Sequence, residues 1–92
     1  MSELNITIPE NFAVEEAAEL RERLYQYLSK GETHFMLNFS NCTFIDSTGL
    51  GVLVSIYKKC MELNGSCKLC SVNGQVMRVF KLTRLDKVFD IK

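Results

Sequence analysis

The side chains best able to do chemistry stand together in one short segment, Asp46-Ser47-Thr48-Gly49. The segment follows an apolar stretch that ends at Ile45 and precedes a stretch with helical periodicity, so it joins a strand to a helix. Ser, Thr and Asp are favoured at any helix start, and Ser47 or Thr48 would occupy the capping region. A helix N-terminus also accommodates phosphate through its free N–H groups and its dipole. The segment therefore indicates either a helix cap or a phosphate-related role.

Other reactive arrangements fit the sequence less well. The segment Ile45-Asp46-Ser47-Thr48-Gly49 lacks the first glycine of the Gly-x-Ser-x-Gly nucleophile elbow. Gly49-Leu50-Gly51 is not followed by the Gly-Lys-Ser/Thr that binds nucleotide phosphates in a P-loop. The single histidine, His34, precedes an apolar run and suits a structural position. These observations argue against an enzyme, and no cofactor is expected.

Four cysteines raise the question of a metal or redox site. Cys67 and Cys70 have the spacing of a redox pair, but they fall within a predicted strand, where odd spacing places two side chains on opposite faces. A four-cysteine zinc site pairs two such motifs, and Cys42 and Cys60 do not form the second. We expect buried, reduced thiols and no metal site.

The elements that must position the Asp46–Gly49 segment follow from the spacing of apolar residues. Alternation predicts a strand over residues 4–8 that ends at Pro9, and steps of three and four predict a helix from about residue 14 to a cap at Gly31. The remaining expected elements are strands over 35–39, 67–72 and 88–91, a helix over 48–63 and a short helix around 76–80. The order β-α-β-α-β-α-β predicts an α/β fold with a mostly parallel small sheet.

The helix after the segment carries two apolar stripes. One contains Leu50, Leu53, Val54, Tyr57 and Met61, and the other contains Val52, Ile56 and Cys60. Such a helix is either buried on both sides or buried on one side and offered to a partner on the other. The sequence leaves both alternatives open.

Length and charge narrow the class of protein. The 92 residues form one domain, and 47% hydrophobic residues suffice for a core. Eleven basic and eleven acidic side chains give zero net charge, which disfavours direct nucleic-acid binding. No apolar run is long enough for a membrane span and no signal peptide is visible, so a cytoplasmic protein is expected. The charge divides into −5 over residues 1–46 and +5 over residues 47–92.

The segment from Thr43 to Leu53, Thr-Phe-Ile-Asp-Ser-Thr-Gly-Leu-Gly-Val-Leu, resembles the signature of the STAS domain, as found in bacterial anti-sigma factor antagonists. Residues 18–40 are similar to that family's first helix and following strand. Residues 70–89 are similar to its third helix and the loop beyond it. The resemblance spans roughly residues 13–91.

The resemblance implies a phosphorylation switch. Ser47 would be phosphorylated by a serine kinase that is also the anti-sigma factor, with Thr48 as the second candidate. The unphosphorylated protein would bind that kinase and release a sigma factor, and a phosphatase would restore the free serine. The expected partner surface consists of Asp46, Ser47, Thr48, Gly49, Leu50, Gly51, Val54 and Lys58.

The sequence departs from the family pattern at three places. By comparison with the family we expect a domain shortened at both ends, and Pro9-Glu10-Asn11-Phe12 stands where the family has a Gly-x-Leu-Asp-like turn that would contribute to the partner site. Thr83-Arg84-Leu85 stands where the family often has Thr-Gly-Leu. A less covered sheet face or edge is therefore expected, with homodimerisation or partner docking there as a hypothesis.

Two other functions remain in competition. A STAS domain can also serve as an adaptor in a lipid- or transporter-associated assembly, where the serine need not be phosphorylated. A small thiol or hydrolytic enzyme acting through Cys67 or Ser47 is the third hypothesis.

Overall fold

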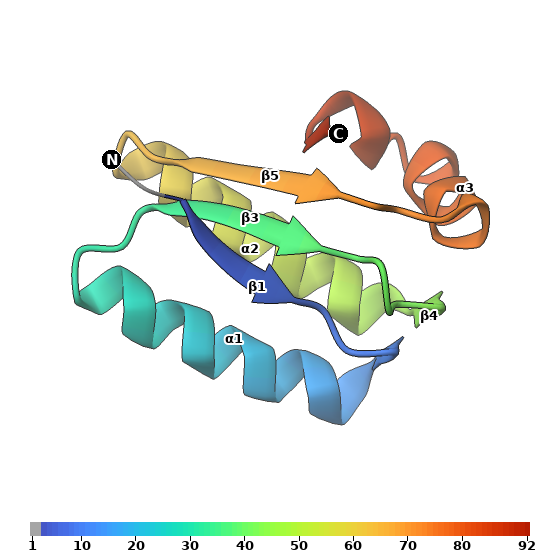
Figure 1. The fold of residues 1–92 in the computed structure, drawn as a ribbon, viewed down its shortest axis with the longest axis horizontal. Coiled ribbons are helices and arrows are strands. Elements are labelled where there is room, and N and C mark those ends of the chain that lie inside the picture. The colour runs from blue at the N-terminus through green and yellow to red at the C-terminus, as the bar shows by residue number, and fades with distance from the viewer. Residues whose placement is uncertain (1–2) are drawn as a thin grey trace.

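A four-stranded parallel sheet organises residues 3–92, the part of the chain that the computed structural model describes (Figure 1). Its strands are β1 (Leu4–Thr7), β3 (His34–Asn38), β5 (Ser66–Cys70) and β6 (Asp90–Ile91), in the spatial order β1-β3-β5-β6. Every neighbouring pair is parallel, with Leu4 opposite Phe35 and Phe35 opposite Cys67. The α/β fold with a mostly parallel sheet is thereby confirmed.

Helices supply the crossovers that parallel strands require. They are α1 (Val14–Ser29), α2 (Ser47–Glu62) and α3 (Gly74–Leu82), and a short 3₁₀ turn, η1 (Leu85–Lys87), follows α3. In Figure 1, α2 lies behind the sheet, α1 runs below it beneath β1, and α3 lies beyond the carboxyl end of β5. The Tyr25 hydroxyl on α1 is 2.5 Å from the Ser55 hydroxyl on α2, so the two helices are also joined to each other.

The two faces of the sheet differ. On the face toward α1 and α2, Phe35 and Leu37 of β3 and Cys67 and Leu69 of β5 are buried. Their neighbours along each strand point to the other face and are only half-buried, and no helix of residues 3–92 lies over them in Figure 1. Cys67 is 3% exposed whereas Cys70 is half-buried. The expectation that these two thiols point to opposite faces is therefore confirmed.

Two very short strands were missed in the sequence. β2 (Asn11–Phe12) and β4 (Phe44–Ile45) form a separate parallel pair, with Phe12 opposite Ile45. Two residues are too few to show an alternating pattern, so the sequence predicts a turn over residues 9–12 and, before the helix, only an apolar stretch that ends at Ile45. The last strand is also shorter than expected, because residues 85–87 form η1 and only Asp90–Ile91 pair with β5.

The structure settles which side of α2 is buried. Its buried residues are Gly49, Val52, Leu53, Ile56 and Cys60. Leu50, Val54 and Tyr57 are half-buried, and Met61 is exposed. The stripe through Val52, Ile56 and Cys60 is therefore buried, together with Leu53 of the other stripe, and the remaining residues of that other stripe lie at the edge of the core.

The backbone conformation of Arg84 shows what one departure from the family pattern costs. It follows the end of α3 with a backbone φ of 62°, in the left-handed region. A side chain in that region costs about 1–2 kcal/mol, whereas glycine adopts it freely. The position therefore favours the glycine that the family often has, and arginine is held there at a cost in stability.

We expect Arg84→Gly to raise the free energy of unfolding by about 1 kcal/mol in urea denaturation, because it relieves this strain. Arg78→Gly, which changes the same residue type inside α3, should lower the free energy of unfolding by about 1 kcal/mol. Destabilisation by Arg84→Gly would contradict the strained conformation.

Candidate functional site

The Asp46–Gly49 segment lies at the carboxyl end of the sheet. β4 lies beyond the carboxyl end of β3, and α2 begins directly after it (Figure 1). The backbone N–H groups of Thr43 and Phe44 donate to the Glu10 carbonyl at 2.9 and 3.2 Å. This pairing brings Glu10 and Asn11, which occupy the position of the family's turn, next to the segment. In open α/β sheets, ligands bind outside the carboxyl ends of the strands.

Asp46 caps helix α2. Its backbone is extended, with φ −111° and ψ −174°, and its Oδ1 accepts a hydrogen bond of 3.0 Å from the Gly49 N–H. The cap is therefore Asp46 rather than Ser47 or Thr48, because the carboxylate reaches the free N–H three residues ahead. As a consequence the hydroxyls of Ser47 and Thr48 are not needed to cap the helix, and both side chains are exposed.

The first turn of α2 packs tightly against β2. A Cβ atom on Gly49 would lie 2.5 Å from the Phe12 carbonyl oxygen and 2.9 Å from the Phe12 ring. Because no real Cβ approaches a backbone oxygen so closely, only glycine permits this contact. By contrast, a Cβ on Gly51 would meet no atom within 4 Å. Gly49 therefore belongs to the core, and Gly51 is an open position on the surface.

The remaining residues of the expected partner surface lie along one helix face. Ser47, Gly51, Val54 and Lys58 follow one another at steps of four, three and four, which places them in one row along α2. Val54 is half-buried and the other three are exposed. We call this row the α2 stripe. Asp46 and Leu50, both half-buried, lie beside its start.

Two residues near the segment were not singled out in the sequence. Phe44 is 52% exposed although it is a large apolar side chain, and a two-residue strand offers no local pattern that distinguishes it from the buried Ile45. Asn73 donates through Nδ2 to the Cys42 carbonyl at 2.7 Å and accepts through Oδ1 from the Val76 N–H at 2.9 Å. Asn73 thus joins the start of α3 to the loop before β4.

Two of the cysteines, Cys42 and Cys67, are poor candidates for catalysis. Burial raises the pKa of the Cys42 thiol, whose Sγ donates to the Phe44 carbonyl. The neighbouring Cys60 side chain and burial together raise the pKa of Cys67. A thiol kept protonated in the core is a weak nucleophile, so these residues do not favour the thiol-enzyme hypothesis. Within residues 3–92, no three His, Cys, Asp or Glu side chains are grouped as metal ligands.

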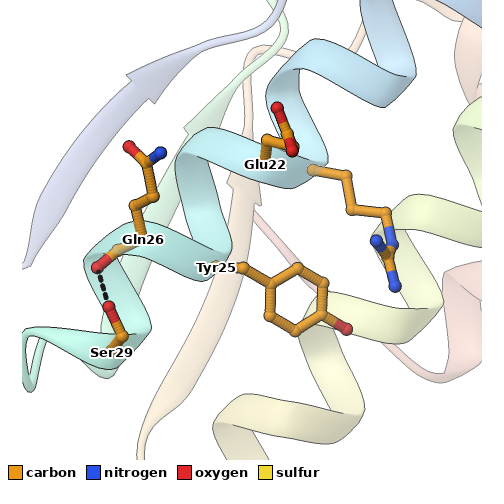
Figure 2. Close-up of a pocket in the computed structure, with 5 residues that line it drawn as sticks. Glu22, Tyr25, Gln26 and Ser29 are labelled. Atoms are coloured by element: carbon orange, nitrogen blue, oxygen red, sulfur yellow. Dashed lines mark hydrogen bonds between the residues drawn. The ribbon is translucent and has the colours of Figure 1, made fainter.

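A surface hollow of about 430 Å³ lies on α1 and includes no residue of the Asp46–Gly49 segment. Figure 2 shows the residues that line it. All of its lining residues, Arg21, Glu22, Tyr25, Gln26 and Ser29, come from α1. The Arg21 guanidinium stacks over the Tyr25 ring at 4.6 Å, and the Tyr25 hydroxyl meets Ser55, eight residues after Ser47 on α2. The polar groups of Arg21 and Tyr25 are therefore used within the fold, and the hollow is a shallow feature of one helix.

With this geometry in place, comparison with known proteins identifies the family. The STAS domain family model matches residues 3–92, and the chain belongs to that family. Over 90 residues it is 30% identical to the anti-sigma-B factor antagonist of Bacillus subtilis, covering 98% of this chain and 82% of the relative. It is 36% identical over 58 residues to the anti-sigma F factor antagonist of Paenibacillus polymyxa, of which it covers 50%.

Solved structures share the fold. The crystal structure of the Thermotoga maritima protein TM1081 superposes with a TM-score of 0.81 at 36% identity, covering 97% of this chain and 70% of that one. SpoIIAA of Bacillus in its phosphorylated form superposes with a TM-score of 0.76 at 18% identity, which shows likeness of fold alone. Among residues 3–92, no helix has the length and apolar character that crossing a membrane requires.

Gly49→Ala should lower the free energy of unfolding by about 2 kcal/mol or more, because its Cβ would collide with Phe12. Gly51→Ala is the matched control, since it removes an exposed helical glycine two residues away. It should raise the free energy of unfolding by about 0.5–1 kcal/mol. Equal effects of the two substitutions in urea denaturation would contradict the different packing of the two glycines.

Proposed function

We propose that this domain is an anti-sigma factor antagonist whose binding is switched by phosphorylation of Ser47. The observation that carries the proposal is the exposed Ser47 hydroxyl in the first turn of α2, left available because Asp46 caps the helix. Membership of the STAS family and the 30% identity to the anti-sigma-B factor antagonist support the role. The expected partner is an anti-sigma factor with serine kinase activity, bound by the unphosphorylated form.

The first turn of α2 suits a phosphate that leaves the fold intact. Phosphorylation adds about −1.5 to −2 charges at pH 7, which the free N–H groups and dipole of the helix start partly stabilise. The neighbouring Asp46 carboxylate repels the same charge. In Bacillus SpoIIAA, both the phosphorylated and the unphosphorylated form share the fold of this chain, with TM-scores of 0.76 and 0.72. The likeness of this chain to both forms supports a modification that leaves the fold intact.

The same phosphate would disrupt a partner packed along the α2 stripe. A close-packed partner would bury the added charge without a matching cation, and an unpaired charge in an interface costs about 2–5 kcal/mol. Gly51 supports such close packing, because it is the next residue after Ser47 on the stripe and has no side chain to hold a partner away. No contact within the fold requires glycine at this position. The domain would act as a binding protein in the cytoplasm, reset by a phosphoserine phosphatase, and not as an enzyme.

Incubation with ATP and each anti-sigma factor kinase of the source organism should place one phosphate on Ser47, detected by peptide mass spectrometry. Ser47→Ala should abolish the modification, whereas Thr48→Ala should leave it in place because Ser47 is the expected acceptor. Phosphate on Thr48 alone would reassign the acceptor. No phosphate with any of these kinases would favour a STAS adaptor that works without phosphorylation.

Ser47→Asp should weaken binding of the cognate kinase by at least about tenfold in calorimetric titration, since it places one negative charge on the α2 stripe. Gln26→Glu on α1 adds the same charge on another exposed surface and should leave the affinity unchanged. Both variants should keep the wild-type circular dichroism spectrum. Equal affinity of Ser47→Asp and wild type would contradict the switch.

A further inference from the structure

Phe44 borders a groove between β4 and α3. The groove has a volume of about 180 Å³, and its lining residues are Thr43, Phe44, Ile45, Gln75, Val76 and Val79. Phe44 is half-exposed at its rim, and it lies three residues before Ser47 in the chain. The groove therefore lies next to the proposed switch and is mostly apolar.

Helix α3 extends this apolar surface. Gln75, Val79 and Leu82 follow at steps of four and three, so they share the face of α3 that borders the groove. Leu82 is 79% exposed, the largest exposed fraction among the large apolar side chains of residues 3–92. We call the surface formed by Phe44, Val79 and Leu82 the docking strip. Isolated exposed apolar residues are common, but a groove with two apolar rims is typical of an interaction site.

The charge on the α3 side of the docking strip is positive, whereas Glu10 and Asp46 lie near its Phe44 end. Arg78, Lys81 and Arg84 are exposed on α3 and just after it, and residues 74–85 contain no acidic side chain. Arg84 is held there in a strained backbone conformation that glycine would relieve. The exposed acidic side chains Glu15, Glu19 and Glu22 belong to α1, which lies along the other side of the molecule in Figure 1.

We propose that the docking strip binds an acidic segment of the partner protein, with one apolar side chain of that segment inserted into the groove between Phe44 and Val79. The basic residues Arg78, Lys81 and Arg84 would attract the flanking carboxylates, and charge complementarity of this kind favours fast and selective association. The identity of that partner as the anti-sigma factor rests on the proposed function. The acidic and apolar character of the partner's segment is inferred from the residues of the docking strip themselves.

This surface gives the phosphate at Ser47 a second effect. The groove ends at β4, whose last residue is followed by Asp46 and Ser47. An added phosphate would place negative charge beside the site where an acidic segment docks, and like charges at an interface repel. Phosphorylation would therefore weaken binding of the partner both along the α2 stripe and at the docking strip.

Nuclear magnetic resonance titration of the ¹⁵N-labelled chain tests the docking strip without any kinase. The probes are three synthetic peptides with the same Leu-Phe-Leu centre, flanked by glutamate, by serine or by lysine. The glutamate peptide should bind most tightly, shift the amide signals of Phe44, Val79 and Leu82, and lose affinity as salt concentration rises. The lysine peptide should bind at least about fivefold more weakly.

Phe44→Ser and Leu82→Ser should each weaken the glutamate peptide at least about fivefold. Leu63→Ser, which changes a 45% exposed residue at the opposite end of α2, should leave the affinity unchanged. Both strip residues are exposed, so the variants should keep dispersed spectra of a folded protein. Ser47→Asp should also weaken the glutamate peptide, by about twofold.

Three results would overturn the docking strip. One is the absence of shifts at millimolar glutamate peptide, and another is equal binding of the lysine peptide. The third is a shift of the strip signals when the chain alone is concentrated, which would mean that the strip binds a second copy of the chain. On that copy Val14, 61% exposed beside Glu15 and Glu16, would be the apolar side chain flanked by carboxylates. Because the peptide titration needs no kinase, phosphorylation of Ser47 without peptide binding would contradict the docking strip but not the proposed function.

Discussion

The contact between Gly49 and Phe12 determines how the rest of the site is arranged. The Phe12 carbonyl oxygen occupies the space that a Cβ on Gly49 would fill, so α2 can begin directly against β2. The same strand pairs with β4 and holds Ile45 in place, and Asp46 then closes the helix start by accepting from the Gly49 N–H. One close approach therefore fixes β2, β4 and the first turn of α2 together.

This arrangement separates the residues of the Asp46–Gly49 segment into two groups. Asp46 and Gly49 serve the fold, since the first caps α2 and the second permits the close packing. Ser47 and Thr48 lie between them and remain exposed. A modification of Ser47 therefore changes the charge of the surface without removing a contact on which the helix start depends. That separation is what a reversible switch requires, because the folded domain must survive both states.

Much of the fold could be predicted from the sequence, because long amphipathic elements have strong patterns. The four buried residues of α1, Ala17, Leu20, Leu24 and Leu28, follow the helical spacing directly. β2 and β4 could not be predicted, since a two-residue strand has no period and forms only through pairing with a distant segment. The docking strip depends on the same tertiary pairing, which brings Phe44 next to α3. The Asn73 bridge to Cys42 joins residues 31 positions apart, which local patterns do not reveal.

The most direct test of the proposed switch is the affinity of the Ser47-phosphorylated chain for the proposed anti-sigma factor partner, measured against the unmodified chain in the same calorimetric titration. Phosphorylation should reduce the affinity at least about tenfold. Amide signals of the phosphorylated chain should change only around the first turn of α2 and the adjoining β4. Equal affinity of the two forms, or loss of the folded spectrum on phosphorylation, would contradict a switch that acts through the surface while the fold is preserved.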